Sequence, residues 1–94
     1  MEAEKATKFV QEIQRETKGL RSNGDLIGTQ RDSPQLRRKL EGQRTKVSNA
    51  ETKLQGLLRA ASHDDRVWDD ISGNYRQAKK EFDAANLAAK KKEK

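Results

Sequence analysis

The feature that most constrains the fold is an alternating three- and four-residue spacing of apolar and small side chains, which recurs in three stretches of the 94-residue chain. In the first stretch the spacing runs through Ala3, Ala6, Val10, Ile13, Thr17, Leu20, Gly24 and Ile27. In the second it runs through Leu36, Leu40, Gln43, Val47, Ala50, Leu54 and Leu57. In the third it runs through Trp68, Ile71, Tyr75, Ala78, Phe82, Ala85 and Ala89. Because this spacing places side chains on one helical face, it predicts three amphipathic helices.

The boundary between the first two helices has clear signals. Gly28 can adopt the positive φ with which helices commonly end, and Ser33 followed by Pro34 provides an N-cap and a first helical residue. The turn dipeptide Asn23-Gly24 leaves open an earlier end near Ser22. The unbroken spacing to Ile27 favours continuation, so helices are predicted over about 3–27 and 34–60.

The second boundary is Ser62-His63-Asp64-Asp65, which has the form of a capping box, with an acid three residues after the serine. It predicts a third helix over about 63–91. This helix holds three of the four aromatic residues and is expected to fill the core.

Three amphipathic helices with short connections bury their apolar faces by packing together, and short connections favour antiparallel neighbours. We therefore predict a single all-α domain over residues 1–94, a monomeric, left-handed, up-down-up antiparallel three-helix bundle. An extended coiled-coil dimer is the structural alternative, which the helix stops at Gly28 and Ser62 disfavour. The predicted core residues are Val10, Ile13, Leu20, Leu36, Leu40, Val47, Leu54, Leu57, Trp68, Ile71, Tyr75 and Phe82.

Composition limits the function classes. The chain has no cysteine, so disulfides and thiolate metal sites are excluded and a cytosolic setting is expected. No signal peptide or bilayer-spanning run is present, so direct membrane insertion is not expected. The net charge of +6 raises nucleic acid as a partner, but acids and bases interleave, and the block Lys90-Lys91-Lys92 is typical of a solvated helix C-terminus.

Catalytic and cofactor chemistry lacks candidate residues. The run Ser62-His63-Asp64 contains the three residue types of a hydrolase catalytic triad. Three consecutive residues cannot orient their side chains into the nucleophile, base and acid of such a triad, and helix capping accounts for their presence. One histidine beside Asp64, Asp65 and Asp69 is typical of a helix start and not of a metal site. The aromatic residues of the third helix repeat every seven positions, which favours core packing over base stacking. We therefore expect no enzyme activity, no cofactor and no nucleic-acid partner.

One surface feature lies on the second helix. Lys39, Lys46 and Lys53 follow one flank of the apolar face, and the other flank holds Arg37 and Arg44, followed by Glu51. Such flanks commonly cover the core edge with their aliphatic stems. The functional alternative is that one flank rims a groove between the second and third helices, where a fourth amphipathic helix with acidic residues could bind.

The first boundary also carries a family resemblance. Its residues Ile27-Gly28-Thr29, Asp32-Ser33-Pro34 and Leu36-Arg37 resemble the linker between the first two helices of the N-terminal regulatory (Habc) domain of endosomal and vacuolar syntaxins, which are Qa-type SNAREs. A second stretch is similar to the start of that domain's third helix; it comprises Asp65-Arg66-Val67, Ile71, Tyr75 and Lys79. The connection between the second and third helices is shorter here than in that family.

The resemblance implies a regulatory protein-binding domain in endosomal or vacuolar vesicle fusion, at the cytoplasmic face of those membranes and as part of a longer protein. The implied partners are a SNARE-motif helix, in the same chain or in trans, and SM-class or tethering proteins. The linker residues Gly28, Thr29, Asp32, Ser33 and Pro34 would be structural. A basic helical nucleic-acid-binding module and a stand-alone helical adaptor are the functional alternatives.

Overall fold

The computed structural model describes residues 2–61 and 66–93 as an all-helical chain. Its helices are α1 (Glu2–Gly24), α2 (Pro34–Ala60) and α3 (Arg66–Glu93), and no strand occurs among these residues. They form an elongated body with extents of 52 × 18 × 16 Å. The all-α, three-helix class predicted from the apolar spacing is confirmed, whereas the handedness of the bundle stays a prediction.

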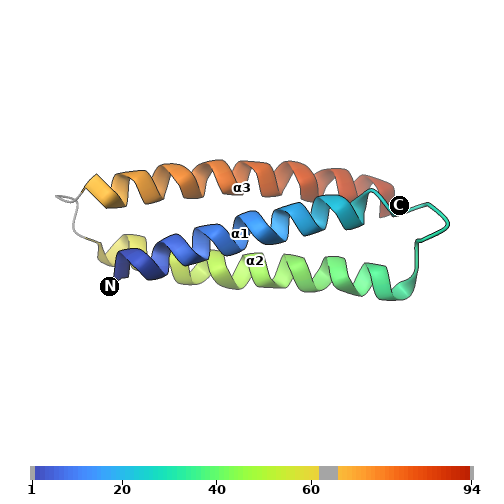
Figure 1. The fold of residues 1–94 in the computed structure, drawn as a ribbon, viewed down its shortest axis with the longest axis horizontal. Coiled ribbons are helices and arrows are strands. Elements are labelled where there is room, and N and C mark those ends of the chain that lie inside the picture. Colours follow the sequence, from blue (N-terminus) through green and yellow to red (C-terminus); the bar gives the residue numbers. More distant parts are fainter. Residues whose placement is uncertain (1, 62–65, 94) are drawn as a thin grey trace.

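The helices alternate in direction along the bundle, and α1 lies between the other two (Figure 1). Helix α1 packs along both α2 and α3, whereas the backbones of α2 and α3 approach each other at few points. Cross-helix side-chain pairs agree with these directions. Glu16 of α1 pairs with Lys46 of α2, and Asp25, just after α1, pairs with Lys92 of α3.

Small residues explain why α1 can pack so closely on α3. A Cβ atom on Gly24 would lie only 3.2 Å from Ala89 Cβ, and α3 faces the core with three buried alanines, Ala78, Ala85 and Ala89. On α1, the residues Ala6 and Thr17 are also buried. Short side chains on both helices therefore let the two backbones approach each other.

Most of the predicted core is buried. The largest fully buried side chains come from α1 and α2 and are Ile13, Leu20, Leu40, Val47 and Leu54. Val10, Leu36, Ile71 and Phe82 are also buried, but Leu57, Trp68 and Tyr75 are only partly buried against the core. The third helix contributes Ile71 and Phe82 to the core together with three buried alanines, while Trp68 and Tyr75 pack against the edge of the core and are partly buried.

The first helix ends three residues earlier than expected. Gly24 is its last residue, and the backbone continues through tighter bonds from Leu26 N to Asn23 O and from Ile27 N to Gly24 O. Such bonds to the third residue back are typical of a helix tail. The tail keeps Ile27 buried, so the apolar spacing correctly identified a core contact beyond the helix. The turn signal of Asn23-Gly24 determined where the helix ended.

Candidate functional site

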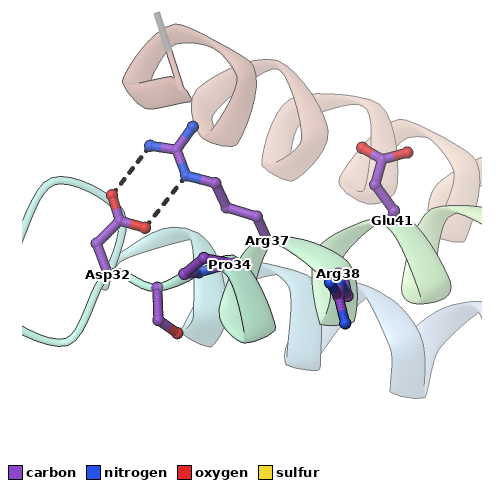
Figure 2. Close-up of a pocket in the computed structure, with 6 residues that line it drawn as sticks. Asp32, Pro34, Arg37, Arg38 and Glu41 are labelled. Carbon is purple, nitrogen blue, oxygen red and sulfur yellow. Dashed lines mark hydrogen bonds and ion pairs between the residues drawn. The ribbon is translucent and has the colours of Figure 1, made fainter.

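The linker between α1 and α2 is held by the carboxylate of Asp32 (Figure 2). Arg37 donates to it through Nε at 3.2 Å and Nη2 at 2.9 Å, and the backbone N–H of Gly28 donates to Oδ2 at 3.1 Å. The hydrogen bonds from Arg37 and Gly28 lower the pKa of Asp32 from 3.8 to about 2. Asp32 thus ties the glycine that reverses the chain to the first turn of α2.

The neighbouring linker residues also make local bonds. Gly28 has a φ of 82°, the positive value that its position predicted. Ser33 caps α2 by accepting a hydrogen bond from Leu36 N at 3.1 Å, and Pro34 opens the helix. The Thr29 hydroxyl donates to Leu26 O at 2.6 Å and accepts from Arg31 N at 3.1 Å. These bonds fix the direction in which α2 leaves the linker.

A shallow hollow of about 670 Å³ lies beside this linker, lined by Asp32, Ser33, Pro34, Arg37, Arg38 and Glu41 (Figure 2). The polar groups of Asp32 and Ser33 are already used by the linker itself. The hollow is therefore part of the turn structure, and nothing in it converges on a ligand.

The predicted lysine flank of α2 faces α1. Lys46 Nζ lies 3.9 Å from a carboxylate oxygen of Glu16, and Lys53 Nζ lies 5.9 Å from the ring centre of Phe9. Lys39 is exposed. The sequence left open which flank rims the groove between the second and third helices, and the structure shows that Lys46 and Lys53 lie against α1 instead. Residues on the opposite side of α2 face α3.

The seam between α2 and α3 is bridged by two polar clusters. The first consists of Glu51 and Gln55 on α2 with Tyr75 and Lys79 on α3. The Tyr75 hydroxyl donates to Glu51 Oε1 at 2.7 Å and accepts from Gln55 Nε2 at 3.1 Å. Lys79 Nζ lies 3.1 Å from Glu51 Oε2, so one carboxylate holds two partners across the seam.

The second cluster is centred on Arg44, the predicted flank residue that reaches α3. Its Nε donates to Asn86 Oδ1 at 2.5 Å, while Nη1 and Nη2 each lie 3.3 Å from a Glu93 carboxylate oxygen. It also pairs with Glu41 on its own helix. The Arg44 side chain is only 12% exposed, so this guanidinium is enclosed by its partners. Arg37, on the same flank, is engaged by Asp32 in the linker.

The electrostatics of the first cluster follow from its geometry. Burial raises the pKa of the Tyr75 hydroxyl above 10.0, and its hydrogen bond to Glu51 adds to this rise. Burial lowers the pKa of Lys79, but the hydrogen bond and charge of Glu51 outweigh it and bring the pKa above 10.5. Both groups therefore stay protonated at neutral pH and act as hydrogen-bond donors to Glu51.

These seam residues were missed as a site by sequence reasoning. Tyr75 was assigned to the core, Glu51 was named only as the residue that follows Arg37 and Arg44 on their flank, and Gln55, Asn86 and Glu93 were not singled out. A signal was available, because Glu51 continues the Arg37 and Arg44 flank at a seven-residue spacing. Whether this flank meets α1 or α3 depends on how the three helices are arranged around one another. The spacing of residues along one helix gives no information about that arrangement.

The described residues show neither a metal-binding cluster nor a membrane-spanning helix. Within residues 2–61 and 66–93, no group of three His, Cys, Asp or Glu side chains could hold a metal ion. No helix in that part of the chain has the length and apolar character needed to cross a bilayer. The capping box and the triad-like run at residues 62–65 lie outside the described residues.

Comparisons of this chain with protein-family models, with curated proteins and with solved structures found no match.

Proposed function

We propose that this chain is a regulatory protein-binding domain of the syntaxin type. It would bind an amphipathic helix, such as the SNARE motif of its parent protein, or an SM-class or tethering regulator during endosomal or vacuolar membrane fusion. The proposal is supported by the three-helix bundle and by the family-like linker, whose residues make mutually supporting local bonds. Binding another helix is an activity that amphipathic bundles provide through side chains between neighbouring helices.

The observation that carries the proposal is the way in which α2 and α3 contact each other along their seam. Helix α1 packs closely on both neighbours, but α2 and α3 approach at few backbone points and are joined by long polar side chains. The ring of Tyr75, which belongs to the first polar cluster, is a partly buried apolar group at this seam. This side of the bundle therefore offers both exchangeable polar bonds and apolar surface.

A partner helix with acidic residues would engage the bases of the two clusters. Its carboxylates would compete with Glu51 for Lys79 and with Glu93 for Arg44. Its apolar face would cover the exposed parts of Tyr75. Exposed charge pairs contribute about 0–1 kcal/mol each, so they would set register and association rate, while desolvated apolar contacts would hold the complex.

The test is a titration of the isotope-labelled domain with a SNARE-motif peptide from an endosomal syntaxin, followed by amide chemical shifts. We expect shifts along residues 44–55 of α2 and 75–86 of α3, with little change along the outer face of α1. Replacing Lys79 with Glu should weaken binding several-fold. The matched control is Lys53→Glu, the same charge reversal on the α1-facing flank, which should leave binding nearly unchanged.

Three outcomes would overturn the proposal. Shifts confined to α1 or to the linker would place the partner elsewhere. An equal loss of affinity in the Lys79 and Lys53 variants would show that only total charge matters. Absence of binding to the SNARE-motif peptide and to an SM-class protein would favour a structural adaptor instead.

A further inference from the structure

The net charge of the chain gathers in one half of the bundle. Residues 13–47 and 80–93 form the half that contains the α1–α2 linker, and they carry thirteen Lys and Arg against seven Asp and Glu, a net charge of +6. This equals the net charge of the whole 94-residue chain. Charges that alternate along the sequence are therefore separated in space once the helices fold against one another.

The excess is strongest at the tip of that half, which we call the basic end and define as residues 21–39 and 87–93. The C-terminus of α3 lies beside the α1–α2 linker there (Figure 1), and Lys92 Nζ is 3.4 Å from Asp25 Oδ1. The basic end holds eight Lys and Arg but only three Asp and Glu. Each of the three acids is paired, Asp25 with Lys92, Asp32 with Arg37 and Glu93 with Arg44.

Six bases of the basic end are exposed and make no ion pair with any described residue. They are Arg21, Arg31, Arg38, Lys39, Lys90 and Lys91. They come from all three helices and the linker, so they surround the tip and do not follow a single helix face. Unpaired bases at this density create a positive potential that attracts an extended anionic surface.

The chemistry around these bases distinguishes between anionic partners. Leu87 is 56% exposed beside Lys90 and Lys91, which is the combination used by segments that lie on a lipid headgroup layer. Base stacking has no support here, because Phe9, Trp68 and Tyr75 lie in the other half of the bundle and Phe82 is buried. The end of an 18 × 16 Å bundle is a blunt surface and presents no single helix to a nucleic-acid groove.

We propose that the basic end is a docking surface for a membrane rich in anionic phospholipids. The six unpaired bases contact the headgroup phosphates, and Leu87, which lies about one helical turn before Lys90 and Lys91 on α3, meets the headgroup layer beside them. The long axis of the bundle then points away from the bilayer, which leaves the α2–α3 seam accessible along its length. This interaction is separate from the proposed helix binding and does not depend on it.

The experiment is co-sedimentation of the whole chain with phosphatidylcholine vesicles that contain or lack phosphatidylserine, at about 0.1 M and about 0.5 M salt. We expect binding only with phosphatidylserine and a strong loss at high salt. Replacing Arg38, Lys39, Lys90 and Lys91 with Gln should weaken binding at least a hundredfold, since each base near an anionic surface contributes about fivefold. Leu87→Ser should weaken it a few-fold without changing its salt dependence.

The matched control replaces Lys5, Lys8, Arg59 and Arg76 with Gln, which removes the same charge from exposed positions in the other half. This variant should lose much less affinity than the basic-end variant. Circular dichroism melts of both variants establish that each remains folded. Equal losses in the two variants, equal binding to neutral vesicles, or tighter binding to a mixed-sequence DNA duplex than to anionic vesicles would each overturn the proposal.

Discussion

The amide end of Gln43 on α2 lies over Gly19 on α1, so closely that a Cβ atom on Gly19 would come within 2.5 Å of Gln43 Nε2. The other atom of this amide, Oε1, is buried and has no hydrogen-bond partner. Gln43 occupies an apolar-face position between Leu40 and Val47, both of which are fully buried. The structure therefore places an unsatisfied acceptor inside an otherwise apolar layer of the α1–α2 contact.

Gln43→Met should stabilise the domain. Methionine keeps the length and flexibility of glutamine but removes the buried acceptor, whose desolvation costs about 1–3 kcal/mol when it is left unpaired. We expect a gain of about 1 kcal/mol, which corresponds to a rise of roughly 4–8 °C in Tm for a domain of this size. Thermal melts measure it.

Gln55→Met is the matched control, because Gln55 lies on the same helix and already donates to Tyr75 and Glu51. It should be neutral or destabilising. If both variants rise in Tm by the same amount, helix propensity or general hydrophobicity is the cause, and the buried acceptor is not.

The same contact predicts a coupling between Gly19 and Gln43. Gly19→Ala gains about 1 kcal/mol of helix propensity but must displace the Gln43 amide, which is the movable end of a side chain. In a Gln43→Ala background nothing has to move, so Gly19→Ala should stabilise more there than in the natural chain. A double-mutant cycle from urea melts gives the coupling energy, expected at about 0.5–1 kcal/mol. A coupling energy near zero would mean that the close approach has no energetic consequence.

The stability lost when a core side chain is truncated to alanine should increase with the burial of that side chain. Leu54 is fully buried, so Leu54→Ala should cost about 2–5 kcal/mol, a large share of the stability of a small domain. Trp68 is a larger side chain but only partly buried, and Trp68→Ala should therefore cost less. Midpoints of thermal or urea unfolding test the order. A greater loss for Trp68→Ala would mean that the indole contributes more to the core than its burial indicates.

The helical parts of the fold were predictable because their causes are local. A spacing of three and four residues identifies a helix face, and Ser33, Pro34 and Gly28 act on the backbone within a few residues of themselves. Ile27 ends the apolar spacing of the first stretch and is buried even though α1 ends at Gly24, since a helix tail can keep the same face inward.

The candidate site was not predictable in the same way. The two flanks of the α2 apolar face are equivalent in spacing, and only the position of α3 relative to α1 determines which flank meets which helix. The structure turns Lys46 and Lys53 toward α1, and Arg44 and Glu51 toward α3. The excess of positive charge at the basic end could not be predicted for a related reason, because its bases come from segments that are far apart in the sequence.

The linker should show a defined pH dependence. The pKa of Asp32 falls from 3.8 to about 2 in the folded protein, so its charged form stabilises the fold. A lowered folded pKa gives stability that is present above the unfolded value and is lost as the pH falls through about 2. Asp32→Asn should therefore lower Tm at pH 7 and lower it progressively less below pH 4. A difference between the natural chain and the variant that stays constant down to pH 2 would contradict this origin.

The last prediction concerns the seam and uses the only tyrosine of the chain as its probe. Burial and the hydrogen bond to Glu51 raise the pKa of Tyr75, whereas the charge of Lys79 lowers it. Glu51→Gln should therefore bring the Tyr75 pKa down toward its ordinary value, and Lys79→Gln should move it further up. Tyrosinate absorbance in an alkaline titration follows this group directly, because no other side chain contributes a phenolate.

The two variants act as controls for each other, since both replace a charged partner of the same cluster with glutamine but move the Tyr75 pKa in opposite directions. A raised folded pKa also means that Tyr75 stabilises the fold below pH 10 and that this contribution disappears as the pH rises through the folded pKa. Melts at pH 8 and above pH 10 should therefore show the stability difference between the natural chain and Tyr75→Phe shrinking with increasing pH. Shifts of the same sign in both glutamine variants would mean that Tyr75 and Lys79 of α3 do not share the Glu51 carboxylate of α2 in solution.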